Sequence, residues 1–182
     1  DHILKEMVDA TVENHFKKEK ELRAKGIKVL SIFFIDRVAN YRSYDEQGNA
    51  VKGKFAEWFE ESFTKWQNMP AYRGLYSFTP EQVHDGYFSQ DKGKFKDSKE
   101  GKSTKADDET FKLIMQDKER LLDINTPLRF IFSHSALREG WDNPNVFQIC
   151  TLNETKSDIK KRQEIGRGLR LCVDQSGARN TD

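Results

Sequence analysis

The residues best suited to chemistry lie near the end of the sequence, between Gln163 and Arg170. A helix turns by about 100° per residue, so Gln163, Arg167 and Arg170 would share one face of a helix here. The planar guanidinium group of arginine donates two parallel hydrogen bonds and therefore suits a phosphate. Gly166 and Gly168 each cost a helix about 1 kcal/mol relative to alanine. That cost indicates close packing or a ligand, although a solvated polar face is the more common meaning of such a pattern.

A second polar stretch, residues 133–146, contains the other candidate groups. Gly140 permits an unusual backbone angle or a close approach, and Asn143-Pro144 indicates a turn. Asp142 places a carboxylate between them. An ordinary connection between two strands, with a buried Trp141, explains this composition equally well.

The spacing of apolar residues predicts the elements that position these groups. Apolar side chains three or four residues apart predict helices over residues 3–22, 55–69 and 111–122, and a last helix that begins at Ser157 or Asp158. Continuous apolar runs predict strands over residues 27–35, 128–132 and 146–152, while residues 75–78 and 83–88 form strands or ordered loop. Helices that alternate with strands buried on both faces predict an α/β fold, with a mainly parallel sheet and helices on both faces.

The same pattern predicts where a ligand would bind. In open parallel sheets ligands gather beyond the carboxyl ends of the strands. The segments that leave Ile35, Phe132 and Leu152 are therefore the candidates for a site.

Composition limits the classes of protein that the chain can represent. Its 182 residues suit one domain, residues 1–182, and its 13 Phe and three Trp supply a core. The net charge of +1 excludes a broadly basic nucleic-acid binder, so any such contact must come from a local patch. Cys150 and Cys172 have no metal-ligand spacing; we expect no metal site and two buried thiols in a reducing compartment.

We also expect a protein without a membrane span, located in the cytoplasm. No apolar run reaches the length of a membrane span, and the sequence starts without a signal peptide or an initiator Met. We therefore expect a soluble piece of a longer protein. The lysine-rich residues 91–105 carry too little apolar surface to offset chain entropy, which predicts a mobile surface insertion.

The candidate stretches together resemble the motifs of superfamily 2 helicases and translocases. Residues 133–146 resemble the fifth motif, and residues 163–170 match the sixth, Q-x-x-G-R-x-x-R. Residues 28–36 are similar to the strand of motif IV, and His84-Asp85-Gly86 is similar to the H-G step that follows the next strand. The nearest likeness is to the helicase-type Res subunit of type III restriction enzymes. It covers most of the chain and is weakest at the polar insertions.

This resemblance implies the second RecA-like domain, of the P-loop NTPase type, in a two-domain ATP motor. ATP and Mg²⁺ would be held mostly by a preceding RecA-like domain that lies outside this chain. Arg167 and Arg170 would then steady the charge on the phosphates, with Gln163 near the γ-phosphate. Asp142 and Gly140 would lie near the ribose or in the coupling network.

The resemblance also implies double-stranded DNA as a partner. The DNA would lie across the tops of both motor domains, with Ser133, Ser135 and Arg37 as candidate phosphate contacts. The chain departs from RNA-type relatives here, because it lacks their Thr-Asp pair and has His134-Ser135 instead. Which atoms touch the nucleic acid therefore stays open.

The parent enzyme implied by the resemblance is an ATP-dependent type III site-specific deoxyribonuclease. It would carry a nuclease domain in the same polypeptide and act with a methyltransferase (modification) subunit. This chain has no P-loop: Gly101-Lys102-Ser103-Thr104 imitates the end of one, but Lys96 stands where the first glycine belongs. We expect the chain alone to bind no cofactor, hydrolyse no ATP and cut no DNA.

Two other readings of the sequence remain open. The first is a non-catalytic RecA-like module for DNA binding or docking, with the lysine-rich residues 91–105 as its contact surface. The second is a stand-alone nucleotide-binding domain, which the missing P-loop disfavours.

Overall fold

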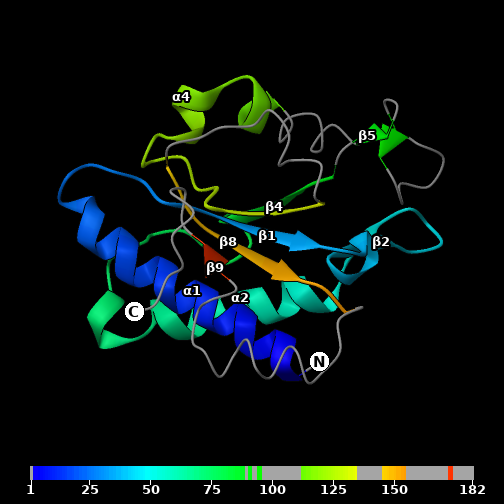
Figure 1. Ribbon diagram of the computed structural model, residues 1–182, viewed down its shortest axis with the longest axis horizontal. Helices are drawn as coiled ribbons and strands as arrows, with labels where there is room; N and C mark the ends of the chain where they lie inside the picture. The colour runs from blue at the N-terminus through cyan, green and yellow to red at the C-terminus, as the bar shows by residue number, and fades with distance from the viewer. Residues whose placement is uncertain are drawn as a thin grey trace.

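A sheet of five strands forms the centre of the molecule (Figure 1). The computed structural model describes residues 2–88, 90–91, 94–95, 112–134, 145–154 and 172–173. In spatial order the strands are β4 (His84–Tyr87), β7 (Phe130–Ser133), β1 (Leu30–Ile35), β8 (Val146–Leu152) and β9 (Cys172–Val173). β4, β7, β1 and β8 run parallel, and β9 runs antiparallel to β8. The predicted α/β fold with a mainly parallel, RecA-like sheet is confirmed.

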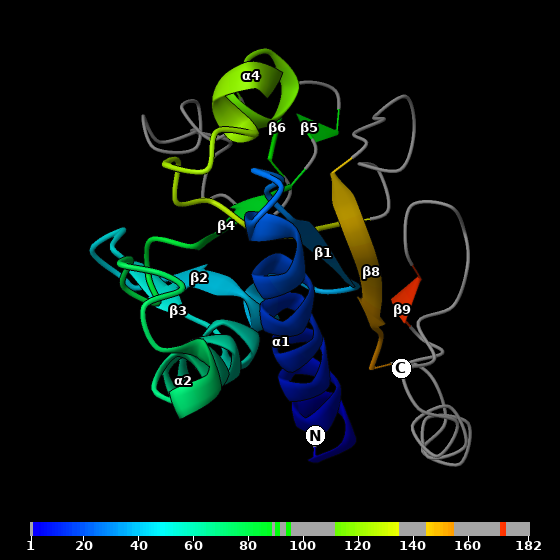
Figure 2. The same cartoon turned by 90° about the vertical axis from the view of Figure 1, so that its left-hand side faces the viewer.

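Two long helices cover one face of the sheet (Figure 2). They are α1 (His2–Arg23) and α2 (Lys54–Gln67), both close to their predicted positions. Phe33 and Ile35 of β1 point into this side, where Phe33 stacks on Phe132 with ring centroids 4.6 Å apart. Many of the phenylalanines predicted to build the core meet here: Phe16, Phe33, Phe55, Phe59, Phe63, Phe88, Phe130 and Phe132.

The opposite face of the sheet is also buried. Leu30, Ile32 and Phe34, the alternate residues of β1, pack there. Their cover comes from the helical residues 112–115 and from α4 (Lys118–Leu121). Side chains of β1 are therefore buried on both faces of the sheet. This explains the continuous hydrophobic run from which a buried parallel strand was predicted.

The end of α1 explains the role of Gly26. Gly26 has a φ of 71°, a conformation that glycine adopts without strain. Its N–H donates to the carbonyl of Arg23, and the N–H of Ile27 donates to the carbonyl of Leu22 at 3.2 Å. This pair of bonds satisfies carbonyl groups in the last turn and ends the helix where the sequence predicted.

Several predicted elements differ from the structure in their bounds. β1 starts at Leu30 rather than residue 27, because the neighbouring strands begin only opposite Leu30 and Ser31. Of the two segments predicted as strands or ordered loop, residues 83–88 contain the strand β4 and residues 75–78 are loop. The single helix predicted over residues 111–122 is broken, since Asp117 leaves helical geometry and its side chain accepts a hydrogen bond from the N–H of Arg120.

The polar residues after β1 contain structure that was not predicted. A 3-10 turn, η1 (Val38–Asn40), leads to the antiparallel strands β2 (Arg42–Tyr44) and β3 (Ala50–Lys52). A second 3-10 turn, η2 (Pro70–Tyr72), follows α2. In the lysine-rich residues, β5 (Gln90–Asp91) pairs with β6 (Lys94–Phe95), and the rest lies outside the described residues, as does the predicted last helix.

Candidate functional site

The carboxyl ends of the parallel strands form one side of the sheet, which we call the carboxyl edge. β1 ends there at Ile35, β7 at Ser133 and β8 at Leu152. The arrowheads of β1 and β8 point to the same side of the molecule in Figure 1. The segments predicted to carry the site therefore all begin at this edge.

Asp36 and Glu154 tie two of these segments together. The backbone N–H of Glu154 donates to Oδ2 of Asp36 at 3.2 Å. The Glu154 carboxylate also forms an ion pair with the ammonium group of Lys54, the first residue of α2. The side chains of Lys54 and Glu154 are 31% and 21% exposed, so the ion pair is partly shielded from water. The second oxygen of Asp36, Oδ1, is buried and has no hydrogen-bond partner among the described residues.

Positive charge dominates the surroundings of Glu154. The hydrogen bond from Lys54 holds the pKa of the Glu154 carboxyl below its ordinary value, against the opposing effect of burial. The Asn40 amide and the charge of Arg37 lower this pKa further. Arg37 itself is exposed. The carboxyl edge thus places Lys54 and Arg37 beside the carboxylates of Glu154 and Asp36, and the exposed guanidinium group of Arg37 is able to bind an anion.

Gly53 determines where Lys54 lies. The N–H of Gly53 donates to the carbonyl of Tyr41 at 2.7 Å. A Cβ atom on Gly53 would lie 2.3 Å from the carbonyl carbon and oxygen of Asn40. Only glycine fits this contact, and α2 consequently starts directly against η1, beside the carboxyl edge.

At the end of β7, Ser133 and His134 are turned toward the protein. Ser133 is fully buried, and its hydroxyl group donates to the carbonyl of His134 at 3.1 Å. The His134 ring packs edge-on against Phe88, with centroids 5.6 Å apart. Both side chains hold the start of the following segment against the sheet.

His84 connects the edge strand β4 to α2. Its Nδ1 lies 2.8 Å from the Tyr41 hydroxyl, and its Nε2 lies 2.7 Å from the Glu60 carboxylate. Lys52 donates to the other oxygen of Glu60 at 2.6 Å. Burial raises the pKa of Glu60, but the hydrogen bonds from His84 and Lys52 outweigh burial and leave that pKa lowered. Because these polar groups are bonded to one another, we interpret the cluster as a structural link between β4 and α2 and not as a catalytic site.

Gly86 completes the same connection. A Cβ atom at this position would lie 2.4 Å from the Phe88 ring and 2.9 Å from the Tyr41 ring. The His-Asp-Gly sequence, which resembles a helicase step, therefore packs β4 against the aromatic core.

The predicted site residues fall into two groups. Arg37 lies at the carboxyl edge with an exposed side chain, and Ser133 lies there with a buried one. The remaining predicted site residues lie outside the described residues: Ser135, Gly140, Asp142, Gln163, Arg167 and Arg170. Their roles stay predictions.

Sequence reasoning missed Asp36, Lys54 and Glu154. Asp36 could have been found, because it directly follows a buried strand at the predicted ligand edge. Nothing in the sequence connects Lys54 with Glu154, since only the fold brings the start of α2 beside the end of β8.

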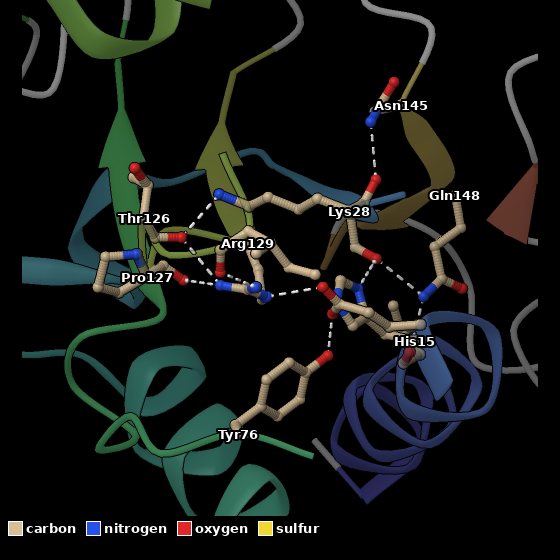
Figure 3. A network of polar contacts seen from close by, with 12 residues as sticks. His15, Lys28, Tyr76, Thr126, Pro127, Arg129, Asn145 and Gln148 are labelled. Carbon is tan, nitrogen blue, oxygen red and sulfur yellow. Dashed lines mark hydrogen bonds and ion pairs between the residues drawn. The ribbon is translucent and has the colours of Figure 1, made fainter. Parts of the chain in front are cut away.

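A second polar network lies at the opposite, amino edge of the sheet (Figure 3). Arg129 is buried there, and its Nε donates to Oε1 of Glu19 at 2.8 Å. Its other nitrogens donate to the backbone carbonyl groups of Ile124, Thr126 and Pro127. The guanidinium group thus binds one carboxylate and closes a turn.

A chain of hydrogen bonds leads from Glu19 to β8. Gln148 donates to the Ser31 hydroxyl at 3.0 Å, and that hydroxyl lies 2.6 Å from Nδ1 of His15. Nε2 of His15 lies 2.9 Å from Glu19, which also accepts a bond from Tyr76. Burial lowers the pKa of His15, against the opposing hydrogen bond and charge of Glu19. The Glu19 carboxylate accepts, so Nε2 of His15 is the donor of their bond. Burial raises the pKa of Glu19, but the bond from His15 and the charge of Arg129 outweigh it and lower that pKa to about 2.

Lys28 extends the network from the start of β1. Its Nζ donates to the carbonyl groups of Leu121 at 2.5 Å and Thr126 at 2.8 Å. Burial, assisted by the charge of Arg129, lowers the pKa of Lys28 to about 7. Lys28 and Arg129 are buried and bonded to carbonyl groups or to Glu19, so this network stabilises the fold at the amino edge.

Other classes of site find little support in the part of the chain that the structure describes. No group of three or more His, Cys, Asp or Glu side chains within it could hold a metal ion. None of the described helices combines the length and apolar character needed to cross a bilayer. Cys150 is a buried free thiol, as predicted, whereas the Cys172 side chain lies outside the described part.

Comparison with known proteins identifies the relatives of the chain. The type III restriction-modification enzyme EcoP15I Res subunit of Escherichia coli is 41% identical over 184 residues, which cover 97% of this chain and 18% of that protein. The EcoPI Res subunit of Escherichia phage P1 is 40% identical over 97% of this chain and 18% of its own length. The StyLTI Res subunit of Salmonella typhimurium is 34% identical over 95% of this chain and 20% of its own length.

The chain spans about a fifth of the length of these relatives. No family model matches it, and no solved structure matches it. Over nearly its whole length the chain is similar to one segment of the type III restriction-modification Res subunits, which confirms the resemblance that its motifs predicted.

Proposed function

We propose that the chain is the second motor domain of an ATP-dependent DNA translocase or helicase within a type III restriction endonuclease. The main observation behind the proposal is that the three motif segments end at, or leave from, the carboxyl edge of the sheet. Residues 28–36 end there in β1, residues 133–146 leave from β7, and the segment with residues 163–170 leaves from β8. In open parallel sheets this edge is where ligands bind.

The pairing of β9 supports the same proposal. Cys172 lies opposite Cys150 and Val173 opposite Ile149, in antiparallel register. The chain therefore enters β9 from the side of β8 that carries its carboxyl end. The segment that contains the arginines thus begins and ends beside the carboxyl half of β8.

In the proposed motor, ATP and Mg²⁺ would bind between this domain and the preceding RecA-like domain, which would hold most of the nucleotide. Arg167 and Arg170 would donate hydrogen bonds to the phosphates, with Gln163 near the γ-phosphate. Asp142 and Gly140 would lie near the ribose or couple nucleotide binding to DNA. Bound Mg²⁺ would neutralise part of the negative charge on the phosphates.

DNA would pass along the carboxyl edge in the proposed motor. The exposed side chain of Arg37 would bind a phosphate, and Ser135 stays a candidate contact. The hydroxyl group of Ser133 is buried and already bonded, so this residue would position the segment that follows it. The complete enzyme would act in the cytoplasm, with a nuclease domain in the same polypeptide and a methyltransferase subunit as partner.

Replacement of Arg167 in the full-length enzyme tests the proposal. Arg167→Ala should reduce DNA-stimulated ATPase activity by a factor on the order of 10³ to 10⁵, because an arginine that stabilises the transferring phosphate contributes that much. DNA binding should survive. Arg73→Ala, which removes an exposed arginine after η2, is the matched control and should leave both activities unchanged.

Two results would overturn the proposal. Wild-type ATPase activity in Arg167→Ala would exclude the arginine role. A parallel loss of DNA binding and ATPase activity would instead favour a DNA-binding module.

A further inference from the structure

A lysine at the carboxyl edge is neutralised by a carboxylate of the same chain. Lys54, the first residue of α2, forms an ion pair with Glu154, which follows the end of β8. The backbone of Glu154 is held separately, since its N–H donates to the Asp36 carboxylate at 3.2 Å. The Glu154 carboxylate is therefore kept beside Lys54 by a contact that does not depend on the ion pair.

Lys54 and Arg37 lie at the two ends of the same short turn, η1. Arg37 directly precedes η1, and Gly53, the residue before Lys54, packs against the carbonyl group of Asn40 at its other end. The hydrogen bond from Lys54 lowers the pKa of the Glu154 carboxyl, and the charge of Arg37 lowers it further. One carboxylate therefore lies within electrostatic reach of both cations.

Both side chains of the ion pair are accessible to solvent in part. The Lys54 side chain is 31% exposed and that of Glu154 is 21% exposed. Nζ of Lys54 also lies 5.7 Å from the centroid of the Phe55 ring and 5.8 Å from that of the Trp58 ring. Aromatic rings at this distance attract a cation. The Lys54 ammonium group should therefore stay in place when its carboxylate partner is removed.

A carboxylate and a phosphate compete for the same ammonium group. Lysine binds a phosphate as a point charge, just as it binds a carboxylate. Each cation that neutralises a DNA phosphate releases a counterion and contributes about 0.9 to the slope of log K against log salt concentration. Lys54 should add little to this slope while Glu154 neutralises it, whereas the exposed Arg37 should contribute fully.

We propose that Lys54 is a second phosphate-binding residue of the carboxyl edge, and that Glu154 occupies it in place of a phosphate and so limits the affinity of this edge for DNA. The inference rests on the proposed function, which makes the DNA backbone the polyanion at this edge. The carboxylate cancels the charge of Lys54, while the guanidinium group of Arg37 remains exposed. Weaker phosphate contacts dissociate faster, which suits movement along DNA.

Salt-dependent binding of duplex DNA by the full-length enzyme tests this competition. Glu154→Gln adds one positive charge, Lys54→Met removes one, and the double variant leaves the net charge unchanged. The control Glu21→Gln also adds a positive charge and releases a lysine, Lys18, whose exposed fraction of 33% is close to that of Lys54. Glu21 lies near the end of α1 that leads to the start of β1, at the amino edge. The Kd for DNA is measured for each protein over a fourfold range of salt concentration.

Glu154→Gln should bind DNA more tightly than wild type, with a slope steeper by about 0.9, because Lys54 gains a phosphate contact. This gain should shrink by about threefold over the fourfold rise in salt. Lys54→Met should bind more weakly, since the unpaired carboxylate would compete for Arg37. The double variant and Glu21→Gln should both match wild type. Opposite effects of the two single variants cannot come from a shared loss of stability.

Three results would overturn the inference. Glu154→Gln that binds no more tightly than wild type would exclude the competition. A double variant as tight as Glu154→Gln would show that Lys54 is not the residue released, and an equal gain in Glu21→Gln would show that net charge alone acts. Failure of the motor function is a separate result, namely wild-type ATPase activity in Arg167→Ala.

Discussion

The charge of Glu19 should make the stability of the fold depend strongly on acid pH. The pKa of Glu19 falls from 4.5 to about 2 on folding, so the folded state holds its proton less tightly than the unfolded chain. Such a group stabilises the fold above its unfolded pKa and loses that effect as pH falls toward its folded pKa. At roughly 1.4 kcal/mol per pKa unit, the contribution is about 3 kcal/mol at neutral pH. About 2 kcal/mol of it should be lost by pH 3.

Urea denaturation of the wild-type chain and of Glu19→Gln, at pH 7 and at pH 3, measures this contribution. Glu19→Gln should be less stable at pH 7 by about 3–5 kcal/mol, because Arg129 remains buried without a charged partner. Between the two pH values, wild type should lose about 2 kcal/mol more than the variant does. Glu61→Gln is the matched control, since its carboxylate is 65% exposed, and it should follow wild type. Equal losses in wild type and Glu19→Gln would refute the reasoning.

Two further predictions concern Lys28 and Gly53. The pKa of Lys28 falls from 10.5 to about 7 on folding, so the unfolded chain binds more protons between these values and the free energy of unfolding should rise with pH across this window. Urea denaturation at pH 7 and pH 9 should show this rise in wild type and a smaller one in Lys28→Met; equal rises would contradict it. Gly53→Ala should destabilise the fold by about 1–3 kcal/mol, because its Cβ would overlap the Asn40 carbonyl group at 2.3 Å. An unchanged thermal midpoint would show that α2 can start elsewhere.

Local patterns in the sequence predicted the elements whose burial is periodic. α1, α2 and β8 lie where apolar spacing placed them, and the Schellman-type end of α1 follows from Gly26. The prediction that the sheet is mainly parallel followed from β1, which is apolar at every position except Ser31 and so suits a strand buried on both faces. Such features can be predicted from the sequence because each depends on neighbours within a few residues.

Features without a buried apolar pattern, and features that depend on distant residues, could not be predicted. The β2–β3 hairpin is local, but its two three-residue strands have no buried positions that alternate with exposed ones. Lys28 and Arg129 look like surface charges within strand-like runs. Both are buried because their partners lie far along the chain: carbonyl groups of Leu121 and Thr126 for Lys28, and the Glu19 carboxylate for Arg129. At the candidate site, Asp36 could be predicted from its position after β1, whereas the pair of Lys54 with Glu154 forms only when the fold brings the start of α2 to the residues that follow β8.

The bonded amino edge also has a mechanical consequence. α1 spans 22 residues, roughly 33 Å at 1.5 Å per residue, and is fastened at its middle to β1 and β8 through His15 and Thr11. Buried polar networks whose members are all bonded make the elements that they join rigid. A displacement at the carboxyl ends of β1 and β8 should therefore move α1 together with the two strands.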